Sequence, residues 1–193
     1  MKNTKTKKIF VGMTALLALI IVGFWYYEYV YTKTPQYTMK ILQKAVINHD
    51  VNTVYQHIDI DKILYKSIDK YIQTEFVNSP QVKNSEYSEM AKALADIALP
   101  IMISKTKQDI NDLITGNTVK KKSILAPIYD NKNSLSMEIN QTKKISDDKA
   151  EIQITITNTK RYTSAPLILK LSRLPDKTWK IFDIDGIEKL SWL

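Results

Sequence analysis

The chain has 193 residues, a formal net charge of +8 and no cysteine. Without cysteine, neither a disulfide framework nor a thiolate metal site can form. Four positive charges come from lysines among the first eight residues and Glu28 subtracts one, which leaves +5 on the chain after the first 32 residues. This surplus is modest for one ordinary domain, so it excludes nucleic acid as the default partner.

An apolar run from Ile9 to Tyr27 contains no charged side chain. As a helix it is long enough to cross a hydrocarbon core of about 30 Å. The lysines before it favour a cytoplasmic N-terminus, and the rings of Phe24–Tyr27 suit the opposite interface. A cleaved signal peptide is the alternative, but it requires small residues where these rings stand. The sequence predicts a cytoplasmic tail over 1–8, a single uncleaved transmembrane anchor over 9–31, and an extracytoplasmic domain over 32–193.

Helical periodicity extends from about residue 35 to residue 116. Thr34 and Pro35 are typical of a helix start, and the clearest amphipathic pattern follows at Ile60–Phe76. A further helix over about 84–99 is expected to be kinked or restarted at Pro100. The segment Ile97–Ile103 is apolar all round, which predicts a core helix, with a patch that contacts lipid or a partner as the alternative.

From about residue 123 to residue 185 the apolar residues alternate with polar ones, which predicts half-buried strands. Asp147-Asp148-Lys149 and Pro175-Asp176-Lys177 are typical of turns between strands. The predicted fold is therefore α+β, with a transmembrane helix followed by several amphipathic helices packed on one face of an antiparallel sheet of about four strands.

The chain resembles a bacterial family of unknown function that has one transmembrane segment and a small exported α+β domain. The residues that carry the resemblance follow the apolar run or lie in the last strand: Thr34-Pro35-Gln36-Tyr37, Ile41, Ala45–Asp50, Ile58–Asp61, Leu64 and Trp179-Lys180-Ile181-Phe182. The resemblance implies no activity. The element order is also similar to cystatin-like folds and to cone-shaped folds of the nuclear transport factor 2 type, by analogy only.

Two pairs of aspartates are the best candidates for acid–base chemistry, because a catalytic couple needs two nearby carboxyls with separated pKa values. A candidate polar pocket comprises His57, Asp59, Asp61, Asp183 and Asp185. We favour structural interpretations for both pairs. Asp59 and Asp61 stand where a helix begins and would cap it, and Asp183 and Asp185 precede Gly186 in a turn. No calcium-loop, zinc or nucleotide-binding motif accompanies them, so no catalytic residue, metal site or cofactor is predicted.

Clusters of basic residues form the second candidate site. We expect them either to be solvated loop surface or to meet at one end of the sheet, where they would contact an anionic ligand. The residues are Lys120, Lys121, Lys122, Lys143, Lys144, Lys160 and Arg161.

The function that these patterns favour is non-catalytic binding or assembly at a bacterial cell envelope, with a possible envelope protein as partner. The contact surface would be the apolar segment around Ile97–Ile103 or the basic clusters. One alternative is a hydrolase-like or isomerase-like enzyme with a small-molecule pocket that uses Asp or His. The other is a binder of anionic envelope polymer or lipid headgroups. The oligomeric state is left open.

Overall fold

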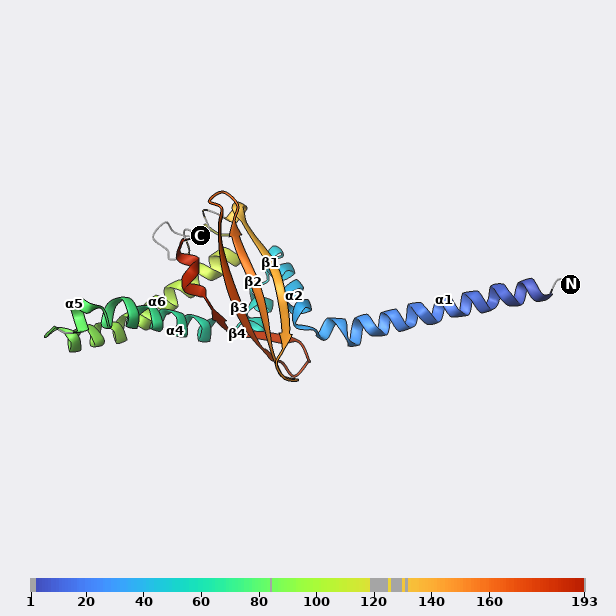
Figure 1. Cartoon of the computed structure of the whole chain (residues 1–193), viewed down its shortest axis with the longest axis horizontal. Helices are drawn as coiled ribbons and strands as arrows, with labels where there is room; N and C mark the ends of the chain where they lie inside the picture. Colours follow the sequence, from blue (N-terminus) through green and yellow to red (C-terminus); the bar gives the residue numbers. More distant parts are fainter. Residues whose placement is uncertain (1–2, 84, 119–124, 126–129, 131, 193) are drawn as a thin grey trace.

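The computed structural model describes residues 3–83, 85–118, 125, 130 and 132–192. Within these residues the fold is α+β, as predicted, with six α-helices followed by a four-stranded antiparallel sheet. Two helical regions extend from opposite sides of the sheet (Figure 1). One is the long first helix, and the other is a pair of helices that projects in the opposite direction.

Helix α1 spans Asn3–Tyr29 and extends away from the rest of the chain (Figure 1). Within the described residues, one stretch, Ala15–Lys33, is long and apolar enough to cross a membrane, with a mean hydropathy of 1.4. By the same criteria it could equally be a signal sequence. This stretch overlaps the predicted 9–31 anchor and is shifted towards the C-terminus.

Capping residues begin the next three helices, and the sequence predicts them for the first and third of these. The helices are α2 (Pro35–Ile47), α3 (Val51–His57) and α4 (Ile60–Tyr71), which continues as a π-helical segment, η2 (Ile72–Val77). The side chains of Thr34, Asp50 and Asp59 accept a hydrogen bond from a backbone N–H in the first turn of α2, α3 and α4 respectively.

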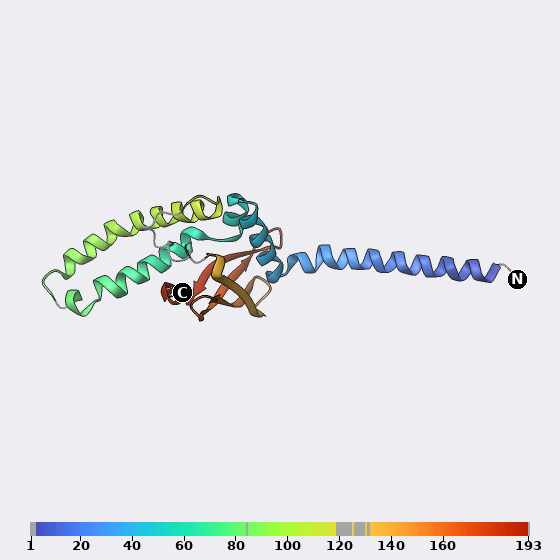
Figure 2. The ribbon, with the colours of Figure 1, turned by 90° about the horizontal axis from the view of Figure 1, so that it is seen from above.

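Two antiparallel helical segments form a hairpin that projects beyond the sheet (Figure 2). Its outgoing arm is α4 with η2, its tip includes the short α5 (Pro80–Lys83), and its returning arm is α6 (Ser88–Ile114). Pro100 lies inside α6, so of the two expected outcomes, a kink or a restart, the restart does not occur. Pro100 is exposed, and the carbonyl that loses its helical partner there can bind water instead.

The sheet is a meander with strand order β1-β2-β3-β4, as predicted. The strands are β1 (Leu135–Lys144), β2 (Lys149–Asn158), β3 (Thr163–Arg173) and β4 (Trp179–Asp185), and a short 3-10 helix, η4 (Ile187–Trp192), follows. Residues between α3 and α4 extend the sheet at its far edge, where Ile58 forms a parallel bridge with Ile181. The N–H of Asp59 donates to the carbonyl of Ile181 at 2.8 Å.

Two clusters of buried apolar side chains stabilise the domain. One combines the inner faces of β2, β3 and β4 with Leu42 of α2 and Ile63 of α4. The other joins α2, α3, α4, η2 and α6. The prediction of a half-buried β1 is wrong for two of its apolar residues, because Met137 and Ile139 are 52 % and 40 % exposed. β1 is an edge strand, and the main helix contacts of the sheet involve β2 and β4.

Candidate functional site

The carboxylates of Asp183 and Asp185 lie between lysines from two different elements. Lys66 of α4 is 2.6 Å from an Asp183 oxygen, and Lys170 of β3 is 2.6 Å from an Asp185 oxygen and 3.4 Å from Asp183. A register shift between Lys170 and Leu171 interrupts the β3–β4 ladder at this point, with Lys170 opposite Asp183. The four side chains therefore form one ion-pair network at the edge where β4 meets α4.

The Asp183 side chain is mostly buried, with 12 % exposed, and its environment favours the ionised form. Burial raises the pKa of its carboxyl, but hydrogen bonds and charge from Lys66 and Lys170 outweigh burial, so the pKa lies below its ordinary value. In the same network, hydrogen bonding to Asp185 raises the pKa of Lys170. A general acid at neutral pH requires the opposite shift, so this arrangement suits ion pairing.

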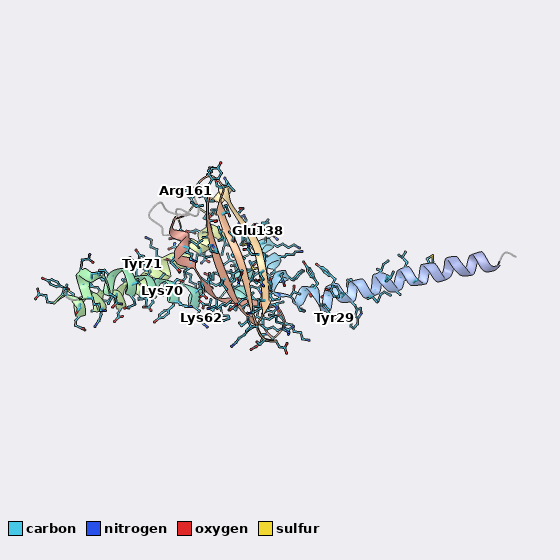
Figure 3. The ribbon with its side chains drawn as sticks, in the orientation of Figure 1. Tyr29, Lys62, Lys70, Tyr71, Glu138 and Arg161 are labelled. Atoms are coloured by element: carbon cyan, nitrogen blue, oxygen red, sulfur yellow. The ribbon has the colours of Figure 1, made fainter. Side chains whose placement is uncertain are left out.

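Lysines at every fourth residue of α4 extend the same contact along the helix. Lys62 lies over the ring of Phe182, with its ammonium nitrogen 4.8 Å from the ring centroid, and Lys70 is 3.8 Å from a carboxylate oxygen of Glu188. Figure 3 labels Lys62 and Lys70 at the two ends of this row. Because residues four apart share one face of a helix, Lys62, Lys66 and Lys70 all lie on the face that α4 presents to β4 and η4.

His57, Asp59 and Asp61 do not join this network. His57 is buried, and its Nδ1 is 2.9 Å from the carbonyl oxygen of Trp179. A carbonyl only accepts, so Nδ1 carries the proton of this hydrogen bond. Asp59 caps α4, whereas Asp61 binds Lys107 of α6 at 2.7 Å, a hydrogen bond that raises the pKa of Lys107.

The structure thus divides the predicted polar pocket into separate structural contacts. Asp61 and Asp183 each bind their own lysines, and His57 stabilises the junction of α3 with β4. A hollow of about 410 Å³ lies beside the network, and its lining includes Asp185, Gly186 and Lys189 with strand residues such as Gln153, but not His57, Asp59 or Asp61. Among the described residues, no group of three acidic or histidine side chains is arranged to hold a metal ion.

The basic clusters do not meet on one face where they are described. Lys143 and Lys144 end β1, next to the β1–β2 turn, where Lys144 pairs with Asp147. Lys160 and Arg161 lie in the β2–β3 turn, at the opposite end of the ten-residue β2, and Arg161 is at the upper end of the sheet in Figure 3. Lys120, Lys121 and Lys122 lie outside the described residues.

A row of exposed apolar side chains runs along α6 and its N-cap residue. Five large side chains spaced by three and four residues are each between 50 and 63 % exposed: Tyr87, Met90, Leu94, Ile97 and Ile101. This set is called the α6 seam below. The alanines Ala91 and Ala95 face inward and are buried. Of these five residues, Ile97 and Ile101 belong to the apolar segment Ile97–Ile103, for which the sequence predicts a core helix with an exposed patch as the alternative.

The small size of the inward-facing residues explains why the large apolar side chains of α6 are exposed. Ala91 and Ala95 let α6 lie close to its neighbours in the hairpin, where Ala95 joins the buried cluster around Leu64 and Ile68. The wider side chains of the α6 seam are then directed away from α4. The apolar run Ile97–Ile103 is divided in the same way: Leu99, Met102 and Ile103 pack inward, whereas Ile97 and Ile101 are 63 % exposed.

Comparisons with family models, with curated proteins and with solved structures gave no match. The resemblance noted in the sequence therefore stays a prediction. Function has to be argued from the surfaces and contacts of the chain itself.

Proposed function

We propose that the chain is a membrane-anchored binding or assembly protein of a bacterial envelope, whose helical hairpin contacts a protein partner outside the cytoplasmic membrane. The observation that carries the proposal is the α6 seam, a row of five exposed apolar side chains on a projecting helix. Soluble surfaces rarely expose contiguous large apolar groups unless they serve an interaction. In this arrangement α1 is the anchor, α2, α3 and the start of α4 cover one face of the sheet, and the hairpin extends away from the membrane.

The shape of the molecule supports this division of roles. α1 and the hairpin extend from opposite sides of the sheet in both views (Figures 1 and 2). If α1 spans the bilayer, the α6 seam stands at the far side of the domain. Lysines precede the apolar run, which favours a cytoplasmic N-terminus and an extracytoplasmic domain.

The state of the polar residues favours binding over catalysis. Asp61, Asp183 and Asp185 are each held by a lysine, and the pKa of Asp183 is lowered rather than raised towards neutral pH. His57 is buried against a backbone carbonyl. These contacts leave Asp183 ionised and ion-paired and place His57 in a buried hydrogen bond, which supports a structural role for both groups.

Site-specific photo-cross-linking in intact cells tests the proposal. A photoreactive residue at Ile97 should give reproducible protein adducts, because this side chain would lie in the contact surface. The matched control is Tyr162, which is 93 % exposed in the β2–β3 turn and lies outside the hairpin. Adducts from position 97 but not from 162 support the proposal. Equal adducts from both positions, or none from position 97, overturn it.

A further inference from the structure

The α6 seam has the repeat of a two-stranded coiled coil. The steps from Tyr87 to Met90, Leu94, Ile97 and Ile101 are three, four, three and four residues, which is a period of 3.5 over two heptads. Alternating steps of three and four align side chains for knobs-into-holes packing against another helix. Within the described residues this row is exposed, so a helix of another molecule could pack on it.

Neutral and mostly small residues flank the α6 seam. In heptad terms the positions beside its centre that are not buried in the hairpin are Ala93, Ala98 and Pro100, and the fourth position beside it is the inward-facing Ala91. These positions carry the charges that select or reject partners in most coiled coils. Because no charge stands there, two identical helices can approach without repulsion, and the small side chains permit a short distance between their axes.

The position of α1 indicates whether two paired α6 helices would be parallel or antiparallel. α1 and the hairpin extend in opposite directions from the sheet, roughly along one line (Figures 1 and 2). Two copies anchored in one membrane would therefore direct their hairpins the same way, with their α6 helices parallel. The same geometry argues against lipid as the occupant, since the α6 seam lies on the far side of the domain from α1.

We infer that the partner of the α6 seam is a second copy of this chain in the same membrane, with the two α6 helices parallel in register. The inference rests on the proposed function and names its partner. In this pair Met90 faces Met90 and Ile97 faces Ile97 of the other copy. Membrane anchoring confines both copies to one surface, and the resulting high effective concentration favours a contact of only about two heptads.

Single cysteines test the inference, because the natural chain contains none. Met90→Cys and Ile97→Cys chains are expressed at native level, and membranes are treated with a short bifunctional maleimide. Both variants should give a cross-linked dimer of the chain. Asp96→Cys, next to Ile97 but exposed outside the α6 seam, is the matched control and should give little dimer. A monofunctional maleimide verifies that all three thiols are accessible.

The alternative outcomes separate the inference from the proposed function. Dimer from only one of the two seam positions indicates helices that cross or run antiparallel, which overturns the parallel arrangement. Photo-adducts at Ile97 that contain a different protein, with no cysteine dimer, preserve the proposed function and overturn the second copy as partner. Accessible thiols that give no dimer, together with no photo-adduct at Ile97, overturn both.

A second variant connects the dimer to the α6 seam itself. Ile97→Lys should reduce the dimer formed by Met90→Cys by roughly tenfold or more, because a charge replaces a buried contact. Ile145→Lys is the matched control, since Ile145 is exposed in the β1–β2 turn, and it should leave the dimer unchanged. Unchanged dimer in Ile97→Lys contradicts the inference. Circular dichroism confirms that both variants retain the fold.

Discussion

At the scale of single residues, Asp183 shows how one carboxylate holds two elements together. It follows the buried positions Trp179 and Ile181 along β4, yet it is charged. Lys66 and Lys170 compensate for its burial from two sides, at 2.6 Å and 3.4 Å. Both lysines retain exposure to water, so the network has one mostly buried charge and several solvated ones. The buried carboxylate is therefore the member whose loss matters most.

Replacing Asp183 with asparagine should lower the free energy of unfolding by about 2 kcal/mol, since charge-assisted hydrogen bonds of this type contribute about 1.5–3 kcal/mol. Asp185→Asn is the control and should cost about 0–1 kcal/mol, because its side chain is 44 % exposed and its ion pair is screened. Urea denaturation of the full chain in detergent measures both. Equal losses in the two variants would contradict a special role for Asp183.

The lowered pKa of the Asp183 carboxyl also predicts that the stability of the fold depends on pH. Its pKa is lower in the folded chain, because the ammonium groups of Lys66 and Lys170 outweigh the effect of burial. The folded state therefore gains stability from this group above its ordinary pKa, near about 4, and loses it as pH falls through the lowered value. The free energy of unfolding should decline below about pH 4, and less steeply in Asp183→Asn than in the natural chain. Identical slopes would show that Asp183 does not contribute.

At the scale of elements, α6 has two apolar faces, one buried in the hairpin and one exposed to solvent. The buried face carries Ala91 and Ala95, and the exposed face carries the α6 seam. A helix with apolar residues all round is normally buried, but the hairpin has one partner arm and covers only one face of α6. The exposed face is then available for contacts between molecules.

Burial predicts a clear difference between two truncations of similar size. Leu42→Ala removes a side chain that joins α2 to the sheet core and should cost about 2–5 kcal/mol of unfolding free energy. Ile97→Ala removes a side chain that is 63 % exposed and should cost less than about 0.5 kcal/mol in the monomer. Denaturation in dilute detergent compares them. A large loss for Ile97→Ala would indicate that α6 is packed differently.

At the scale of the whole molecule, the domain separates two surfaces. α1 leaves one side of the sheet and the hairpin leaves the other (Figure 1). The outgoing arm contacts β4 and η4 through Lys62, Lys66 and Lys70, and Ile63 joins it to the core of the sheet. In the proposed orientation, the domain would hold the α6 seam away from the level at which α1 would enter a membrane.

The proposed orientation predicts selective labelling in intact cells. Lys83→Cys places a thiol at an exposed position of the hairpin tip, and Lys5→Cys places one in the basic tail. A membrane-impermeant maleimide should label Lys83→Cys in intact cells and Lys5→Cys only after the cells are opened. Labelling of the tail in intact cells would reverse the topology. Labelling of both positions in opened cells is the control for reactivity.

The sequence alone determined the features that depend on local order along the chain. The caps at Thr34 and Asp59, the alternation of Ile152, Ile154 and Leu169 in the strands, and the uncharged run before Tyr27 are local signals, and they predicted the α+β order and the long apolar helix. Tertiary structure alone decided which lysine meets Asp183 and which face of α6 is covered. Lys66 and Asp183 are 117 residues apart, and no periodicity encodes such a pair. The exposure of Ile97 likewise depends on how many helices pack around α6, which is a property of the assembled fold and not of the helix itself.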